Sequence, residues 1–106
     1  MSQQTLFGLR LDAITMDAAV RRCLDAVENG EPLEVGVVNA AKIVAMGKNP
    51  ELAASVSGCG MIVADGQSVV WASKVLRRPL PERVAGIDLF TNLMAKAEEL
   101  GLRVFF

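Results

Sequence analysis

The chain has 106 residues, 52% of them hydrophobic, and its mean hydropathy of +0.36 is high for a small domain in water. Its 11 Lys and Arg residues are balanced by 12 Asp and Glu residues, so a net charge of -1 supplies no positive field for binding nucleic acid. The chain has no histidine, and Cys23 and Cys59 lack the spacing of metal ligands, which excludes a zinc site and a histidine base within these residues.

The cysteines and the uncharged segments indicate a cytoplasmic protein. Two lone cysteines are typical of a reduced chain, in which they behave as small, partly buried apolar side chains. The longest uncharged run, residues 52–64, is shorter than the roughly 20 apolar residues that cross a bilayer. Residues 1–5 are polar and do not resemble a secretory signal.

The first part of the chain predicts strand, helix and strand in succession. Residues 5–11 predict a short strand that Gly8 interrupts. Thr15 is a candidate N-cap for a helix whose apolar residues recur at helical spacing until Asn29-Gly30 ends it. Residues 34–38 predict a second strand, whose valines suit a sheet that is buried on both faces.

The middle of the chain predicts two more helices around a third strand. Residues 40–46 predict a helical turn or two. Asn49-Pro50 is a strong start signal for a helix that should end near Gly58, because Asn caps helices and Pro suits their first position. Residues 61–64 predict the third strand, and a helix over 68–76 follows.

The last part predicts a loop, a long helix and a final strand. Residues 77–86 hold two prolines and three arginines, and residues 89–100 form an amphipathic helix that Gly101 closes. Residues 102–106 predict a fourth strand ending in two phenylalanines. An exposed phenylalanine forgoes about 1.5–3 kcal/mol of burial, so we expect a piece of a longer protein. The alternative is that this strand lies inside the sheet and the protein ends there.

Alternation of strands and helices predicts right-handed βαβ units and a parallel sheet. The predicted fold class is therefore α/β, a Rossmann-like open parallel sheet with helices on both faces. We expect this fold to be incomplete, with residues 1–106 forming the N-terminal portion of one domain. The surplus of apolar residues further leads us to expect a homo-oligomer.

The pair Asp65-Gly66 stands directly after the strand at 61–64 and directly before a predicted helix. In open α/β folds the carboxyl ends of parallel strands border the crevice where ligands bind, so Asp65 is a candidate acid or base. Aspartate is also favoured at helix N-caps and beside glycine in tight turns. Residue type and position leave both interpretations open.

Two other polar residues are candidates for binding a ligand. Arg83 follows two prolines, and its guanidinium could bind a phosphate or carboxylate bidentately, although an internal pair with Glu82 or Asp88 competes. Asn39 ends the second strand, where its amide could bind a sugar hydroxyl or nucleotide or could cap a helix. No G-x-G-x-x-G, Walker A or D-x-D sequence occurs, so a diphosphate would need cationic side chains or helix N-termini.

The apolar and basic residues between these candidates are interpreted as structural. Trp71, the only tryptophan, lies in a predicted helix, and we expect it in the core or in an interface. Arg77 and Arg78 are interpreted as a solvated basic loop. The residues show no basic amphipathic helix of the kind that lies on anionic lipid.

Two segments carry a resemblance to a known family. Residues 64–89, ADGQSVVWASKVLRRPLPERVAGIDL, and residues 37–44, VVNAAKIV, resemble the WecG/TagA/CpsF family of bacterial glycosyltransferases. The family pattern of Asn-Ala after a strand, Asp-Gly ahead of a helix and E-R-V-x-G-x-D-L is reproduced in order. The resemblance extends from about residue 6 to residue 106 and covers the N-terminal part of a family member.

The resemblance implies an inverting, metal-independent transfer of a sugar from a UDP-sugar to a polyprenyl-diphosphate-linked acceptor, without a cofactor, in cell-envelope or exopolysaccharide assembly. It implies that Asp65 is the general base and that Asn39, Gly66 and Arg83 bind substrate. For that role we expect the Asp65 carboxylate to be unneutralised and to project into an open hollow. Some members carry Thr where this chain has Val37, so that hydroxyl is absent here.

The resemblance also bears on partners and location. It leads us to expect that these residues alone are inactive or weakly active. It further implies a cytoplasmic protein in peripheral contact with the inner face of the membrane through a C-terminal part. The competing hypothesis is a non-catalytic α/β ligand-binding or self-association module.

Overall fold

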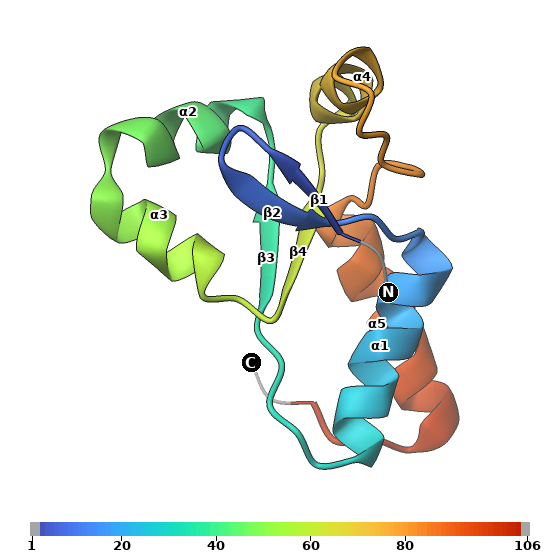
Figure 1. The fold of residues 1–106 in the computed structure, drawn as a ribbon. Coiled ribbons are helices and arrows are strands. Elements are labelled where there is room, and N and C mark those ends of the chain that lie inside the picture. The colour runs from blue at the N-terminus through green and yellow to red at the C-terminus, as the bar shows by residue number, and fades with distance from the viewer. Residues whose placement is uncertain (1–2, 105–106) are drawn as a thin grey trace.

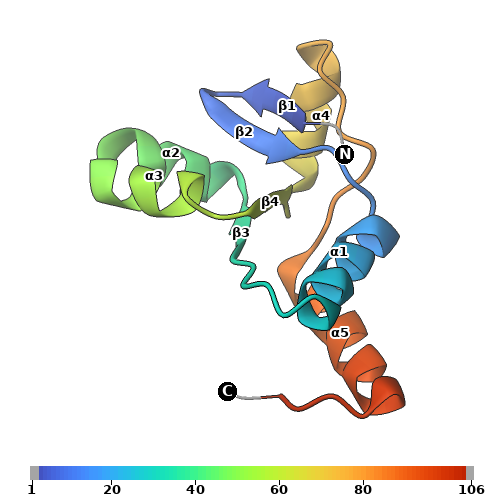
Figure 2. The ribbon, with the colours of Figure 1, turned by 60° about the horizontal axis from the view of Figure 1, so that its bottom comes forward.

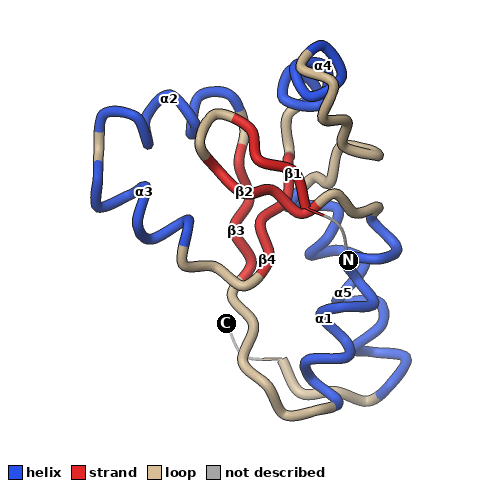
Figure 3. The backbone as a smooth tube through the Cα atoms, viewed as in Figure 1, coloured by secondary structure: helices blue, strands red, loops and turns tan. Residues whose placement is uncertain are grey.

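The computed structural model describes residues 3–104, which form a mixed α/β fold with two small sheets (Figures 1 and 3). Strands β1 (Gln3–Leu6) and β2 (Leu9–Asp12) pair antiparallel, and β3 (Val35–Val38) and β4 (Met61–Ala64) pair parallel. The predicted α/β class is therefore confirmed. The described residues do not, however, form one open sheet of four parallel strands, because the first strands make a separate antiparallel sheet.

The helices flank the parallel pair. They are α1 (Met16–Glu28), α2 (Ala40–Lys48), α3 (Pro50–Ser57), α4 (Gln67–Val75) and α5 (Gly86–Leu100). In both ribbon views α2 and α3 lie on one side of β3 and β4, and α1 and α5 lie on the other (Figures 1 and 2). The parallel pair thus occupies the centre of the molecule.

The single strand predicted over residues 5–11 is wrong, because these residues belong to a β-hairpin. Phe7 and Gly8 form its turn with φ values of 55° and 73°, and Leu6 faces Leu9 across it. A two-residue hairpin of type I′ needs positive φ at both turn positions, which Asn-Gly supplies most readily. Phenylalanine is unusual at such a position, so the residues gave no turn signal.

The two faces of β3 and β4 pack against different apolar clusters. Val38, Ile62 and Ala64 pack with the hairpin leucines and with side chains of α2 and α3. Met61 and Val63 point the other way and pack with side chains of α1 and α5. Every residue of β4 is buried, as expected of a strand covered on both faces.

A buried carboxylate fastens the hairpin to β4. Asp12 is only 6% exposed, and its Oδ2 accepts a hydrogen bond of 2.7 Å from the backbone amide of Ile62. Its Oδ1 accepts from Gln3 Nε2 at 3.2 Å and lies 3.8 Å from Nη1 of Arg22. The charge of Asp12 is thus compensated on both oxygens, which a buried carboxylate requires. The sequence analysis did not single out this residue.

Two more long-range hydrogen bonds hold the N-terminal segment in place. Arg78 Nη1 donates to the carbonyl of Thr5 at 3.0 Å. The backbone amide of Met16 donates to Glu82 Oε1 at 2.7 Å, at the start of α1. The hairpin and the start of α1 therefore depend on residues that lie far along the chain.

Three helix ends follow the sequence prediction. Thr15 caps α1, since its Oγ1 accepts from the amide of Ala18 at 3.2 Å. Asn49 caps α3, with Pro50 at its first position. Gly101 ends α5 in the left-handed conformation, with a φ of 69°.

The end of the chain departs from the prediction. Residues 102–104 form no strand, so the fourth strand is wrong for these residues, and residues 105–106 lie outside the described part. The amide of Leu102 donates to the carbonyl of Ala97 at 2.8 Å, which folds the chain back at the end of α5. Helix α5 also begins at Gly86, three residues before the predicted start at Leu89.

Candidate active site at the carboxyl end of the parallel strands

Asp65 follows β4 directly and continues its hydrogen-bond ladder. Its backbone amide donates to the carbonyl of Val38 at 2.8 Å, so Asn39 and Asp65 leave the two strands side by side. On the other side of β4, the amide of Val84 donates to the carbonyl of Ala64 at 2.8 Å. The loop after α4 is thereby brought back to the carboxyl end of the sheet.

The structure pairs Asp65 with Arg83. Arg83 Nη2 lies 3.2 Å from Asp65 Oδ1, and Arg83 Nε donates to the Asp65 backbone carbonyl at 2.7 Å. Side chains of Asp65 and Arg83 are 28% and 52% exposed. The internal partners considered for Arg83 in the sequence analysis, Glu82 and Asp88, are not the ones the structure gives it, and Glu82 instead binds the start of α1.

The Asp65 carboxylate also lies at the start of α5. Its Oδ2 accepts from the backbone amide of Gly86, the first residue of α5, at 3.3 Å. It makes no capping bond to α4, whose N-cap is Gly66 and has no side-chain hydrogen bond. The capping interpretation therefore names the wrong helix, although the carboxylate does lie at the positive end of a helix dipole.

The expectation of an unneutralised carboxylate in an open hollow is wrong. Arg83 supplies the opposite charge, and Asp65 is not among the residues that line the adjacent cleft. That cleft, of about 390 Å³, lies on the far side of Arg83 and is lined by Met16, Glu82, Arg83, Asp88, Thr91 and Asn92. The carboxylate is nevertheless more than a quarter exposed and receives one backbone amide, so a ligand can still reach it.

Asn39 and Gly66 bring the starts of two helices together. Asn39 caps α2, because its Oδ1 accepts from the backbone amide of Lys42 at 2.9 Å. A Cβ atom added to Gly66 would lie 3.5 Å from both Cα and Cβ of Asn39, which is ordinary van der Waals contact. Helices α2 and α4 therefore begin beside each other, and the four predicted site residues share one edge of the sheet.

Helix starts dominate the electrostatics of this edge. Helices α2, α4 and α5 all begin here, and α4 and α5 have N-caps without side-chain hydrogen bonds. The first amide groups of such helices carry partial positive charge and can receive an anion. The edge thus offers backbone donors next to the Arg83 guanidinium.

Sequence analysis missed one cation at this edge. Lys42 Nζ donates to the carbonyl of Val37 at 3.1 Å, inside the first turn of α2. Its position three residues after Asn39 was the available signal, since that spacing places it over the start of the helix. Val37 itself packs on α5, because a Cβ added to Gly86 would lie 3.4 Å from its Cγ atoms.

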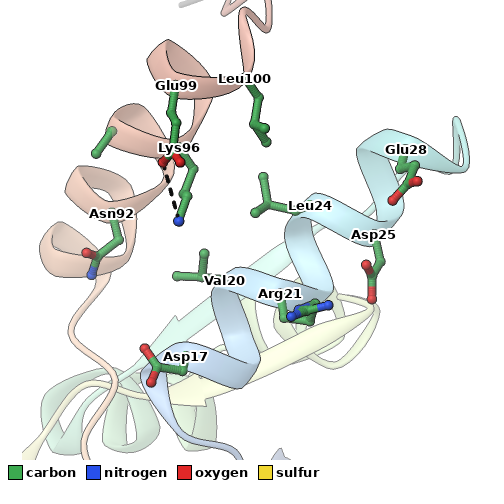
Figure 4. A pocket seen from close by; sticks show the side chains of 11 residues that line it. Asp17, Val20, Arg21, Leu24, Asp25, Glu28, Asn92, Lys96, Glu99 and Leu100 are labelled. Carbon is green, nitrogen blue, oxygen red and sulfur yellow. Dashed lines mark hydrogen bonds and ion pairs between the residues drawn. The ribbon is translucent and has the colours of Figure 1, made fainter.

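A second, wider cleft lies away from these residues. It has a volume of about 620 Å³ and runs between α1 and α5 (Figure 4). Acidic side chains such as Asp17, Asp25 and Glu28 line it together with Val20 and Leu24 (Figure 4). None of the predicted site residues contributes to it, so it does not bear on their chemistry.

The described residues were also compared with the requirements of metal sites and membrane spans. Within residues 3–104 no three Asp, Glu or Cys side chains come together as candidate metal ligands. Among these residues, no helix combines the length and the apolar character that crossing a bilayer requires. Metal independence of the reaction stays a prediction.

Comparison with known proteins decides the family. The family model described as "Glycosyl transferase WecG/TagA/CpsF family" matches residues 4–106. The chain belongs to this family. The resemblance carried by Asp65-Gly66 and by the E-R-V-x-G-x-D-L segment is thereby confirmed.

One relative illustrates the activity found within the family. A Bacillus spizizenii protein named N-acetylglucosaminyldiphosphoundecaprenol N-acetyl-beta-D-mannosaminyltransferase is 46% identical to this chain over 59 residues. That match covers 56% of this chain and 23% of the relative. The aligned segment is thus less than a quarter of the relative's length, and the activity of the whole relative comes to this chain only as a proposal.

Proposed function

We propose that this chain forms part of an inverting glycosyltransferase that moves a sugar from a UDP-sugar to a polyprenyl-diphosphate-linked acceptor in cell-envelope or exopolysaccharide assembly. Membership of the family supports the reaction class, and the name of the Bacillus relative supports the kind of acceptor. The observation that carries the proposal is the meeting of Asn39, Asp65, Gly66 and Arg83 at one edge of the sheet.

In this proposal Asp65 is the catalytic base. It takes the proton of the acceptor hydroxyl, whose oxygen attacks the anomeric carbon of the donor sugar from the face opposite the UDP. The bond from that carbon to the diphosphate oxygen breaks, and its electron pair leaves with UDP. One carboxylate is sufficient for this chemistry, and Arg83 fixes its orientation through the side chain and the backbone carbonyl.

The positive charge at the edge is assigned to the leaving diphosphate. Arg83 Nε and Nη2 bind Asp65, so further guanidinium N–H groups remain to reach a phosphate oxygen. The starts of α2, α4 and α5 offer backbone amides, and Lys42 offers an ammonium group. These groups stabilise the charge that develops as UDP departs, without a metal ion.

The proposal extends to architecture and location. The parallel pair β3 and β4, with a helix after each strand, supports a Rossmann-like open sheet built around this pair. We place the protein in the cytoplasm, in peripheral contact with the membrane that holds the lipid-linked acceptor, and infer that it self-associates.

Replacing the proposed base tests the mechanism. In the product of the complete reading frame that encodes these residues, Asp65→Asn should lower acceptor-dependent UDP release by about 100-fold or more, because the amide cannot take a proton. Asparagine keeps the shape and can still accept from Gly86, and UDP binding should stay within about twofold of the wild type. Asp25→Asn on the exposed side of α1 is the matched control and should leave UDP release unchanged.

The Arg83 pair supports a second candidate function. A carboxylate held by a guanidinium and a helix amide is also what a structural bridge requires, which favours a non-catalytic ligand-binding or self-association module. Undiminished UDP release by Asp65→Asn, together with a lowered thermal midpoint, would establish that structural role and would rule out Asp65 as the base.

A further inference from the structure

The side of the molecule formed by the hairpin, α2 and α4 carries a distinct charge. Residues 3–11, 39–50 and 66–81 contain six of the 11 cations and none of the 12 acids. The cations are Arg10, Lys42, Lys48, Lys74, Arg77 and Arg78. Figure 1 places these three segments at the upper end and the acid-rich α1 and α5 at the lower end. A chain with a net charge of -1 is thus strongly polarised.

An apolar cavity opens among the same three segments. It has a volume of about 240 Å³ and is lined by Phe7 of the hairpin turn, Ala40, Ile43 and Val44 of α2, and Ser68, Val69 and Ala72 of α4. Phe7 and Val44 are 55% and 60% exposed. The cations therefore surround a surface whose centre is apolar.

Helix α4 adds its own exposed apolar side chains. Trp71, Val75 and Leu76 are 66%, 81% and 51% exposed, while Val69 and Val70 on the opposite face are buried. Trp71 and Val75 each follow a cavity-lining residue of α4 by three positions and so lie beside the cavity on the helix surface. The expectation that Trp71 lies in the core is wrong, and α4 with the residues after it is a basic, apolar surface that the sequence analysis did not find.

The backbone at the end of α4 is strained in favour of a cation. Arg77 has a φ of 58°, and its amide and that of Arg78 bond back to Lys74 and Ser73 at 3.1 and 2.9 Å. This is the pattern in which glycine is the favoured residue. Within residues 3–104 the only other non-glycine residue with positive φ is Phe7, on the same side of the molecule.

We propose that this side docks on an anionic lipid bilayer, with Trp71, Val75 and Leu76 at the level of the headgroups and with Lys74 and Arg77 against lipid phosphates. Tryptophan and aliphatic side chains flanked by cations suit the membrane interface, where the ring has an apolar body and a polar N–H. An apolar protein partner would not require six cations without an acid. A second copy would set its cations against those of the first.

The position of the docked side deepens the proposed function, and this step rests on that function. Asn39 and Gly66 start α2 and α4, the two helices that border the apolar cavity. Docking would therefore present the candidate active site to an acceptor whose diphosphate lies at the headgroup level. Bilayer binding itself requires no transferase activity.

The single tryptophan reports the docking directly. Because Trp71 is the only one in the chain and is exposed, phosphatidylglycerol/phosphatidylcholine vesicles should shift its emission to the blue and cosediment the protein, whereas pure phosphatidylcholine should do neither. Lys74→Gln with Arg77→Gln should weaken binding to the anionic vesicles by about tenfold or more. Arg21→Gln with Arg103→Gln, the same charge change on exposed residues outside these segments, should leave binding within about twofold.

Two single variants separate docking from folding. Arg77→Gly relieves the strained backbone, so it should raise the thermal midpoint while weakening vesicle binding, a combination that a structural role cannot produce. Val75→Ser should weaken vesicle binding and leave the fold intact, because the side chain is 81% exposed.

Three results would overturn the proposal. They are an absence of the emission shift on anionic vesicles, equal losses in the two double variants, and a dimer in sedimentation that Val75→Ser dissociates while vesicle binding is absent. Asp65→Asn should bind vesicles as the wild type does, so failure of docking and failure of the catalytic assignment are separate outcomes.

Discussion

The Asp65 carboxylate joins two segments, because Oδ1 binds the Arg83 guanidinium and Oδ2 binds the backbone amide of Gly86. Both segments come from beyond α4, so the carboxylate holds the returning chain against the end of β4. A base in this setting is oriented before the substrate arrives. Orientation of this kind raises the rate by removing the entropy of alignment from the reaction step.

The candidate residues were accessible from sequence, but their pairing was not. Asp65 and Asn39 could be placed at the carboxyl ends of adjacent strands because strand and helix patterns bracket them. Arg83 had acidic neighbours at Glu82 and Asp88, and nothing local showed that the loop returns to β4. Its choice of Asp65 depends on the backbone bond between Val84 and Ala64, which is a tertiary contact.

Cys23 provides a prediction on pH. Burial raises the pKa of the Cys23 thiol, and the nearby Arg22 charge opposes part of that rise. The folded thiol therefore keeps its proton at pH values where the unfolded thiol loses it, so the free energy of unfolding falls as the pH rises above about 8.5, the thiol pKa of an unfolded chain. Urea denaturation under reducing conditions should show this decline in the wild type and less of it in Cys23→Ser.

Cys59→Ser serves as the control for that measurement. It keeps Cys23 and should retain the wild-type decline. A decline that Cys23→Ser leaves at full size would assign the pH dependence to other groups.

At the scale of the elements, Asn39 combines a structural and a proposed functional role. Its Oδ1 caps α2, and Asn39→Ala should lower the free energy of unfolding by about 1 kcal/mol because the amide of Lys42 loses its partner. Asn39→Asp keeps the acceptor and should retain nearly full stability. Aspartate has no amide donor for a substrate, so UDP release should fall in both variants, and calorimetry with the activity assay checks the separation.

A loss of UDP release that is confined to Asn39→Ala would contradict the substrate role. The residue would then act through the helix alone. Asn49→Ala, which removes the corresponding cap of α3 away from the site, controls for the effect of losing a cap on stability.

Elements with a local chemical signal were predictable, and those that depend on tertiary contacts were not. The cap at Thr15, the Asn49-Pro50 start and the Gly101 end belong to the first group, because each involves residues a few positions apart. The start of α5 belongs to the second group, since its first amide is bound by Asp65 from a distant strand. The hairpin was missed because a phenylalanine occupies its turn.

At the scale of the whole molecule, Asp12 connects the two sheets. Asp12→Ala would leave the buried amide of Ile62 without its acceptor and Arg22 without its carboxylate. We expect a loss of about 3 kcal/mol in the free energy of unfolding, as for other buried charge-assisted bonds. Urea denaturation followed by circular dichroism measures it, with Asp25→Ala on the exposed side of α1 as a control within about 0.5 kcal/mol of the wild type. Equal stabilities for the two variants would contradict the role of Asp12.

The separation of the two sheets also explains why the arrangement was not predicted whole. An antiparallel hairpin of two four-residue strands and a parallel pair of two four-residue strands have similar apolar patterns. Only the turn and the Asp12 bond distinguish a separate hairpin from another strand of one sheet. Both are details that hydrophobic periodicity does not contain.

The three long-range bonds of the N-terminal segment have a consequence for biosynthesis. Thr5, Asp12 and Met16 bond to Arg78, Ile62 and Glu82, residues that leave the ribosome much later. During translation the hairpin emerges first and has no docking surface until most of the chain has followed. Its leucines must then wait in an exposed state, so the nascent chain is a natural client for a ribosome-bound chaperone.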